Sequence, residues 1–248
     1  GVPDLPIIAK IEKPAAVDRI DEILAVADGL LVARGDLGIE MPLPQLPAVQ
    51  KKLVLAARRA GVPVIVATQV LESMRTEPRP TRAEVTDAAH AVDEGVDAIM
   101  LAGETAVGKY PVRAVAMLDA IVREAERAGS VALAGPVTGT RFPEHGRALC
   151  EAAVALANRA NALAIVALTR AGKTARGLAA LRPAAPIFAA TPHARTAGQL
   201  SLVWGVTPML IADASAAAVR MSLLDHGDVP AGAVIVIVSV SPVLGQQD

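Results

Sequence analysis

The chain has 248 residues, 53% of them hydrophobic and 20% charged, so a large buried core is available and a disordered chain is excluded. Lys and Arg number 24 against 25 Asp and Glu, which excludes a basic surface for nucleic acid or for an acidic membrane. Only two Phe, one Trp and one Tyr are present, so stacking of bases on aromatic side chains is excluded as well.

The cysteine content and the N-terminal residues indicate the compartment. Cys150 is the only cysteine and cannot form an intrachain disulfide, which is typical of a reducing compartment. Residues 1–10 show neither a basic start nor a long apolar run, so no signal peptide is expected. The apolar stretch at residues 152–168 is interrupted by two Asn and one Arg, which argues against a membrane span. We therefore expect a globular cytoplasmic protein with neither a membrane nor a nucleic acid as partner.

Short apolar runs recur through the first half of the chain, each bounded by turn residues. They lie at residues 6–9, 30–33, 64–67 and 98–101. Runs of this length without polar alternation are typical of strands buried on both faces, as in parallel sheets. Helices are predicted at residues 45–60, from a capping box at Thr81 to Gly95, and at 112–128 after Pro111. The order is four βα units, which suits a (β/α) barrel or a doubly wound sheet.

A second domain is predicted after a segment rich in Gly, Pro and Thr at residues 129–146. The domains are therefore expected to cover residues 1–130 and 131–248. Strands are predicted near residues 163–168, 186–190, 206–211 and 233–240, with helices near 147–158, 174–181, 194–202 and 215–224. This alternation predicts a smaller, open, three-layer α/β domain.

Polar residues follow every predicted strand of the first half. They are Lys10 and Glu12, Arg34 and Asp36, Thr68 and Gln69, and Glu104 and Thr105. Reactive side chains collect at the carboxyl ends of parallel strands, and residues two apart on a strand share a face. Lys10 and Glu12 are therefore expected to point the same way, and so are Arg34 and Asp36. Two such carboxylates can share Mg²⁺, and a lysine beside a metal offsets the charge of a transferring phosphoryl group.

A single polar residue at a strand end is most often just a solvent-exposed residue. Catalysis is indicated here because polar residues follow the strand in all four βα units. The motifs around these residues add a family resemblance. IAKIEKP at residues 8–14 resembles the active-site signature of pyruvate kinases, and VARGDLG at 32–38 and ATQVLESM at 67–74 resemble the next two blocks of that family. PRPTRAEV at 78–85 and GETA at 103–106 follow in the family's order. The resemblance runs from residue 7 to about residue 126 and continues more weakly through the second domain.

The resemblance implies that the first domain is the second half of the pyruvate kinase TIM-type barrel, strands five to eight. It implies phosphoryl transfer from phosphoenolpyruvate to ADP in glycolysis, giving pyruvate and ATP, with Mg²⁺ or Mn²⁺. Lys10 would stabilise the phosphoryl group in transit, and Glu12 and Asp36 would hold the metal. The backbone around Arg34, Gly35 and Asp36 would bind the substrate carboxylate. Thr68 would help to protonate the enolpyruvate through a water relay, since threonine alone is too weak an acid.

Two departures from the family are expected to matter. Ala102 stands where the family usually has a serine within reach of a proton relay. The family's first half has no counterpart before Gly1, and that half supplies barrel strands one to four, the K⁺ ligands, phosphate-contacting arginines and the lid over the nucleotide. The family is expected to use K⁺, but the residues that bind it belong to the missing half. Little activity is therefore expected of this chain alone.

The second domain carries a candidate effector site in the segment TRAGKT at residues 169–174, which resembles the loop where many pyruvate kinases bind a phosphorylated effector. Thr169, Gly172, Lys173 and Thr174 are the candidate residues, because a Gly-containing loop with Lys and Thr at a helix N-terminus suits an anion. A P-loop is rejected, since the Gly four residues before Gly-Lys-Thr is absent. An ordinary turn capped by Thr174 stays an alternative. The family's final strand is expected to be missing beyond Gln246, which weakens the candidate site.

Other functions stay open at this point. One is a metal-dependent enolate lyase or aldolase of the phosphoenolpyruvate-related barrels, and the other is a non-catalytic remnant or a regulatory, oligomerising subunit. Four parallel strands cannot close a barrel, so the strands at residues 6 and 98 are expected to be open edges. The inward face of the sheet is expected to lose the side chains that cover it in a closed barrel. The residues expected on that face are Val64, Val66, Ile99 and Leu101. The chain is therefore expected to form a homo-oligomer or to pair with a separate N-terminal half.

Overall fold

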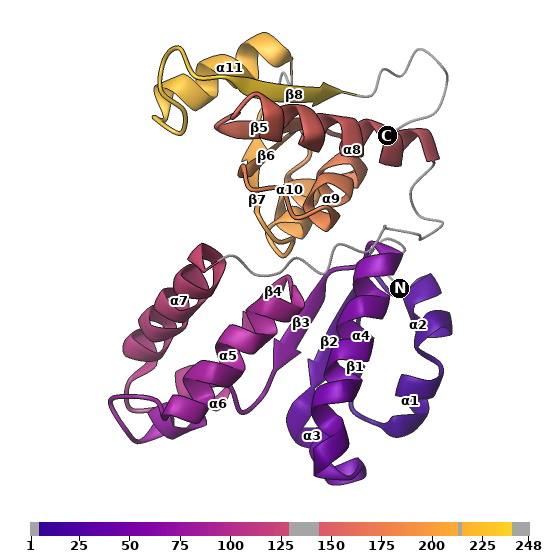
Figure 1. Ribbon diagram of the computed structural model, residues 1–248, viewed down its shortest axis with the longest axis vertical. Coiled ribbons are helices and arrows are strands. Elements are labelled where there is room, and N and C mark those ends of the chain that lie inside the picture. The colour runs from indigo at the N-terminus through magenta and orange to yellow at the C-terminus, as the bar shows by residue number, and fades with distance from the viewer. Residues whose placement is uncertain (1–4, 129–143, 213–214, 240–248) are drawn as a thin grey trace. The chain divides into compact units, whose positions relative to one another are not determined.

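The computed structural model describes residues 5–128, 144–212 and 215–239. The chain divides into two compact units, Gly1–Gly135 and Pro136–Asp248, and in the described residues each unit contains one four-stranded sheet (Figure 1). The predicted division into residues 1–130 and 131–248 falls on residues outside those that the structure describes.

The sheet of the first unit is parallel throughout, in the order β1-β2-β3-β4. Its strands are β1 (Ile8–Ile11), β2 (Gly29–Ala33), β3 (Val64–Ala67) and β4 (Ala98–Met100). The helices are α1 (Pro14–Asp18), α2 (Ile20–Val26), α3 (Arg34–Glu40), α4 (Leu46–Ala60), α5 (Arg82–Glu94), α6 (Gly103–Ala106) and α7 (Pro111–Arg127), with 3₁₀ turns η1 (Leu43–Gln45) and η2 (Glu72–Arg75). The strands and α4, α5 and α7 lie within two residues of their predicted positions, whereas α1, α2, α3 and α6 were not predicted.

Local signals set the ends of α5. Thr81 Oγ1 accepts a hydrogen bond from the Glu84 N–H at 3.3 Å, and the Glu84 carboxylate accepts one from the Thr81 N–H at 2.7 Å, as the predicted capping box requires. At the other end Gly95 adopts φ +85°, a left-handed conformation that glycine reaches without a steric penalty. The helix is thereby held in place directly after the loop that follows β3.

The carboxylate of Glu84 also joins α5 to η2, and this junction is a site where stability depends on pH. It accepts hydrogen bonds from the Ser73 N–H and hydroxyl at 2.7 and 2.6 Å and from the Thr81 N–H and hydroxyl at 2.7 and 2.8 Å. Burial raises the pKa of Glu84, but the hydrogen bonds from Ser73 and Thr81 outweigh it and lower the pKa below its usual 4.5.

We expect Glu84→Gln to lower the free energy of unfolding at pH 7 by about 1–3 kcal/mol, because the amide NH₂ group replaces an accepting oxygen and faces the donors of Ser73 or Thr81. A carboxyl whose pKa is lowered on folding contributes stability above its unfolded pKa and loses that contribution as the pH falls through the folded pKa. The difference should therefore shrink below about pH 4.5. Urea unfolding of both proteins at pH 7 and pH 3.5 measures it, with the exposed Glu77→Gln as control. An equal difference at both pH values would contradict this assignment.

The core of the first unit lies between the sheet and its helices. Leu53, Val54 and Ala57 of α4 pack against a set of fully buried side chains from β2 and β3: Leu30, Val32, Val64 and Val66. Val64 and Val66 therefore face the helices, and Ile99 and Leu101 also pack in helix-side clusters. The expectation that these four residues lose their cover was wrong. Because both faces of these strands are apolar, the sequence lacks the alternation that tells the faces apart.

The opposite face of this sheet carries Ile8, Leu31, Ile65 and Met100, as the strand register shows. Ile8 and Met100, on the strands at the two ends of the described sheet, are 43% and 40% exposed. The more exposed apolar side chains of this face are therefore those on β1 and β4.

The second unit contains a parallel sheet in the order β7-β6-β5-β8, with helices on both faces (Figure 1). Its elements are α8 (Glu144–Arg159), β5 (Ala164–Leu168), α9 (Lys173–Ala180), β6 (Ile187–Thr191), α10 (Ala194–Leu200), β7 (Val206–Leu210), α11 (Ala216–Asp225) and β8 (Ile235–Ser239). Residues of α8 and α9 pack against Ile165 and Ile187 on one face, and residues of α11 pack against Val166 and Phe188 on the other. This is the predicted three-layer arrangement, and all of these elements lie where the sequence places them, apart from residue 240, which is outside the described residues. None of the described helices has the length and apolarity needed to cross a membrane.

Candidate active site

Three of the polar residues predicted for the rim, Lys10, Glu12 and Asp36, meet at the carboxyl ends of β1 and β2. Lys10 Nζ lies 2.6 Å from Glu12 Oε2 and 2.9 Å from Asp36 Oδ2. Lys10 is in β1 and Glu12 comes directly after it, so the two side chains point the same way. All three side chains are partly exposed, so a ligand from solution can reach them.

The charges of this cluster stabilise one another. Glu12 and then Asp36 raise the pKa of the Lys10 ammonium through hydrogen bonds. The hydrogen bond from Lys10 in turn lowers the pKa of Asp36 below its usual 3.8. Lys10 and Asp36 are therefore both charged at neutral pH, with the single ammonium shared between two carboxylates.

The donor set of this cluster fits a hard divalent cation. Mg²⁺ prefers oxygen ligands and is typically held by one or two carboxylates, with substrate phosphates and waters completing its octahedron. Among the described residues no group of three or more His, Cys, Asp or Glu is placed to hold a metal. Glu12 and Asp36 are two carboxylates, the number of protein ligands with which Mg²⁺ is typically held.

Arg34 and Asp36 do not share a face, contrary to the prediction. The helix α3 begins at Arg34, so these two residues are separated by a helical rather than a strand rotation. Asp36 reaches Lys10, whereas Arg34 is 6% exposed and its Nη1 donates to Asp87 Oδ2 at 2.5 Å. Nothing in the sequence indicated this helix, because Gly35 and Gly38 have low helix propensity. The tertiary structure nevertheless forms a helix here, so residues two apart do not share a face as they would in a strand.

Thr68 lies directly after β3 in an unusual backbone conformation. Both Thr68 and Gln69 have positive φ, +69° and +53°, which is rare for residues other than glycine. The Thr68 hydroxyl donates to the Ala67 carbonyl at 2.6 Å and accepts from the Gly35 N–H at 2.7 Å. The loops after β2 and β3 are thereby joined, and Gly35 and Thr68, predicted as separate site residues, are direct partners.

Glu104 lies in α6, directly after β4, and connects two segments of the rim. It is 1% exposed, and its carboxylate accepts hydrogen bonds from the Leu71 N–H at 3.0 Å and the Ala102 N–H at 2.9 Å. The loops after β3 and β4 are therefore tied together by a buried carboxylate. Ala102 itself brings only its backbone and a methyl group to the rim.

Comparison with known proteins identifies the family of this chain. The family model described as pyruvate kinase, barrel domain, matches residues 2–115, and the one described as pyruvate kinase, alpha/beta domain, matches residues 147–248. The chain belongs to the pyruvate kinase family. Pyruvate kinase from Methylorubrum extorquens is 47% identical over 210 residues, which cover 84% of this chain and 44% of that protein. Pyruvate kinase 2 from Synechocystis is 47% identical over 209 residues, which cover 84% of this chain and 35% of that protein.

A solved structure shows the same likeness in three dimensions. A pyruvate kinase from Cryptosporidium parvum superimposes with a TM-score of 0.86 at 34% identity, covering 95% of this chain and 49% of that one. The chain thus spans less than half the length of the curated pyruvate kinases named above, and about half of the solved one.

The loop that resembles the pyruvate kinase effector loop joins β5 to α9. Gly172 precedes α9 with φ +82°, and its N–H donates to Thr169 Oγ1 at 2.9 Å. Lys173, the first residue of α9, is exposed, while Thr169 and Thr174 are buried. The residue before the helix is Gly172, and no side-chain hydrogen bond caps the helix there, so the expected cap by Thr174 was wrong, while the alternative of an ordinary turn stays open.

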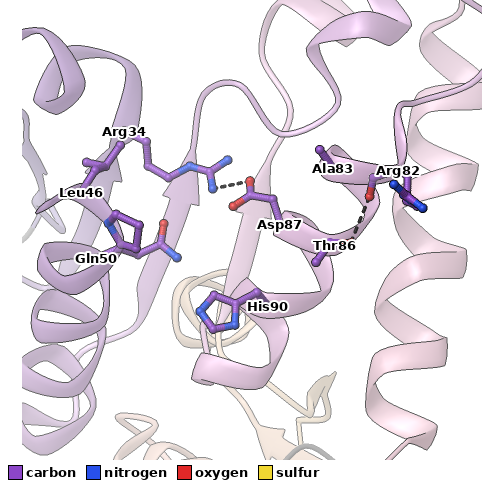
Figure 2. Close-up of a pocket in the computed structure, with 9 residues that line it drawn as sticks. Arg34, Leu46, Gln50, Arg82, Ala83, Thr86, Asp87 and His90 are labelled. Atoms are coloured by element: carbon purple, nitrogen blue, oxygen red, sulfur yellow. Dashed lines mark hydrogen bonds and ion pairs between the residues drawn. The ribbon is translucent and has the colours of Figure 1, made fainter. Parts of the chain in front are cut away.

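A cavity of about 640 Å³ between α4 and α5 adjoins the rim residue Arg34 (Figure 2). Gln50 and Leu46 of α4 line it, together with Asp87 and His90 of α5. Of these, Asp87 is the partner of Arg34 and was missed in the sequence, because one Asp in the middle of an amphipathic helix is most simply an exposed helix residue.

Proposed function

We propose that the native protein containing this chain is a pyruvate kinase that transfers a phosphoryl group from phosphoenolpyruvate to ADP. The proposal rests on one observation above all: the Lys10 ammonium lies between two carboxylates, Glu12 and Asp36, at the ends of neighbouring parallel strands in a member of this family. The first unit then corresponds to strands five to eight of the family's barrel. The second unit is its three-layer domain.

The chemistry requires that a P–O bond of phosphoenolpyruvate breaks while one forms to a β-phosphate oxygen of ADP, which leaves the enolate of pyruvate. A Mg²⁺ or Mn²⁺ ion on Glu12 and Asp36 would supply positive charge against the phosphoryl oxygens and the enolate oxygen. Lys10 would turn its ammonium from these carboxylates toward the phosphoryl group and offset the charge in transit. The pair of carboxylates holds the ammonium at the rim until substrate arrives.

The substrate carboxylate is proposed to bind at the backbone around Arg34, Gly35 and Asp36. The Gly35 N–H now donates to the Thr68 hydroxyl. A carboxylate that takes this N–H displaces the Thr68 oxygen. The hydroxyl, which donates to the Ala67 carbonyl in this structure, would then turn from that carbonyl to face the enolate. Since a threonine hydroxyl is a weak acid, the proton reaches the methylene carbon through water held at Thr68.

One alternative has an observation of its own. Ala102 places a methyl group where the family usually has a serine hydroxyl, which favours a non-catalytic, regulatory or oligomerising subunit. A metal-dependent enolate lyase or aldolase is less well supported, because Lys10 suits a phosphoryl group and the second unit belongs to the pyruvate kinase family's α/β domain.

A coupled assay of pyruvate formation with phosphoenolpyruvate, ADP, Mg²⁺ and K⁺ tests the proposal. We expect turnover by the native protein and none of note by the 248-residue chain alone, since phosphoryl transfer depends on positioning and on exclusion of water. Rapid turnover by the chain alone, lost in Lys10→Met, would show that this half suffices. A native protein that binds Mn²⁺ but forms no pyruvate would favour the non-catalytic subunit.

The sheet edges are proposed to pair with other protein, either a second copy or the N-terminal half of a pyruvate kinase. The supporting observation is the exposed apolar side chains of Ile8 and Met100 on β1 and β4. We expect the sedimentation coefficient of the chain to rise with concentration, and the amides of residues 8–11 and 98–100 to gain protection in step. A concentration-independent monomer with protected edge amides would contradict inter-chain pairing.

An effector site is proposed at Thr169, Gly172, Lys173 and Thr174 for a phosphorylated ligand. Exposed Lys173 beside the left-handed Gly172, at the start of an eight-residue helix, supports it. Hydrogen exchange across residues 169–174 with and without inorganic phosphate, in wild type and Lys173→Ala, tests this binding.

A further inference from the structure

We propose that Arg34 is a positioning residue whose guanidinium fixes Thr68 at the rim. The inference rests on the proposed function, in which Thr68 takes part in protonating the enolate. It differs from the role expected for Arg34 from the family resemblance, where the backbone around this residue contacts the substrate carboxylate.

The guanidinium of Arg34 is buried and directed at the loop after β3. Its Nη2 donates to the Thr68 carbonyl at 2.9 Å and to the Gln69 carbonyl at 3.2 Å, and its Nε reaches the Thr68 carbonyl at 3.3 Å. Its Nη1 donates to Asp87 of α5 at 2.5 Å. Figure 2 shows the side chain extended from the end of β2 toward Asp87. The planar fork of arginine matches two carbonyls and a carboxylate at once, which lysine cannot do.

The two carbonyls that Arg34 holds belong to the two strained residues of that loop. Thr68 and Gln69 are consecutive non-glycine residues with positive φ, and such conformations persist only where their surroundings hold them. The directions of their carbonyls follow from this backbone conformation. The hydrogen bonds from Arg34 therefore select it over an ordinary extended strand end.

The residue after Arg34 holds the Thr68 side chain as well. The Gly35 N–H donates to Thr68 Oγ1, and a Cβ at Gly35 would lie 3.3 Å from that oxygen. Adjacent residues at the start of α3 thus hold the carbonyl and the hydroxyl of one threonine. A change in the Arg34 side chain should displace the Thr68 hydroxyl while Lys10, Glu12, Asp36 and Thr68 themselves all remain.

Asp87 completes this arrangement from α5. Its side chain is 41% exposed and lines the same cavity as Arg34, and there it pairs with the guanidinium. Asp87→Asn keeps a hydrogen-bond acceptor and removes the charge. We expect it to have a smaller effect than any variant that removes the guanidinium.

The test separates the proton step from the rest of the reaction. By microscopic reversibility, the group that protonates the enolate also removes a methyl proton from pyruvate. In D₂O that proton is lost to solvent, and the enolate carbon takes up a deuteron in its place. We would follow this exchange by NMR in the native protein for Arg34→Met and Arg34→Lys, with the exposed Arg19→Met as control. Mn²⁺ affinity, measured on the same variants, reports whether Asp36 in α3 is still in place.

We expect Arg34→Met to slow methyl exchange by about tenfold to a hundredfold, as for a misplaced catalytic group, with Mn²⁺ affinity unchanged. Arg34→Lys should recover only part of this loss, since an ammonium can donate to the Thr68 carbonyl but lacks the planar fork that holds both carbonyls and Asp87 at once. In a Thr68→Ala background, Arg34→Met should cause no further loss, because Arg34 acts through Thr68.

Two outcomes would overturn the proposal: a parallel loss of Mn²⁺ affinity in Arg34→Met, or losses that multiply in the Thr68→Ala background. Either would mean that Arg34 only maintains the fold of α3. If wild type exchanges no pyruvate protons, the proposed function fails and amide exchange of Gly35 decides the inference by itself. Faster exchange of that amide in Arg34→Met, with the amides of β2 unchanged, would support the proposal, and no change would overturn it.

Discussion

Replacing Asp36 by alanine is expected to weaken Mn²⁺ binding by about tenfold or more, because a hard cation loses one of two anionic ligands. Glu12→Ala should have an effect of similar size. The affinity of wild type itself should be modest, since substrate and water complete the coordination. Titration with Mn²⁺ followed by electron paramagnetic resonance measures this. Glu40→Ala is the matched control, because Glu40 is an exposed carboxylate that pairs with Lys13.

The same titration carries a pH dependence. Lys10 lowers the pKa of Asp36 below its usual 3.8, so Asp36 stays ionised as the pH falls from 8 to 5. The ratio of wild-type to Asp36→Ala affinity should therefore stay constant over that range. Equal affinities in wild type and in both alanine variants would contradict the metal assignment.

Replacing Lys10 by methionine is expected to lower phosphoryl transfer by the native protein by roughly 10³-fold, as when a charge that stabilises a transferring phosphoryl group is removed. The substitution keeps an unbranched side chain, one atom shorter, and removes the ammonium group with its charge and its hydrogen-bond donors. The coupled pyruvate assay measures it. Lys13→Met is the matched control, because Lys13 is exposed, lies three residues away and pairs with Glu40 rather than with the metal-site carboxylates.

Mn²⁺ binding by Lys10→Met shows whether lost activity comes from the missing ammonium or from unfolding of the protein. The ammonium now occupies the two carboxylates that the metal needs, so its removal should leave Mn²⁺ affinity equal or higher. Activity retained within a few-fold would contradict the role of Lys10. Loss of both activity and metal binding would show that Lys10 maintains the site rather than acting in transfer.

Much of the fold follows from local features of the sequence. Buried apolar runs mark each strand, the capping box at Thr81 and Glu84 starts α5, and Gly95 ends it. These signals act over a few residues, so they can be seen without the tertiary structure. The short helices α1, α2, α3 and α6 were missed because each is held by its neighbours more than by its own sequence.

In the candidate site, too, contacts within one short segment could be predicted and contacts between distant segments could not. Lys10 and Glu12 could be placed together because both lie along one extended segment, where the period of two holds. The contact of Arg34 with Thr68 and Asp87 depends on where α3 begins and on how α5 packs, and neither is fixed by spacing in the sequence. Which face of the sheet the helices cover was also predicted wrongly. Both faces of these strands carry apolar residues, so the sequence does not show which face packs against the helices.

The central claim is that Glu12 and Asp36 hold the metal while Lys10 faces the phosphoryl group. Crystals of the native protein grown with Mn²⁺ and phosphoenolpyruvate test it most directly, because anomalous scattering locates the metal. The account predicts an anomalous peak bonded to a carboxylate oxygen of Glu12 and of Asp36, with the phosphoryl oxygens against the Lys10 ammonium. A metal found elsewhere, with both carboxylates still paired to Lys10, would contradict it.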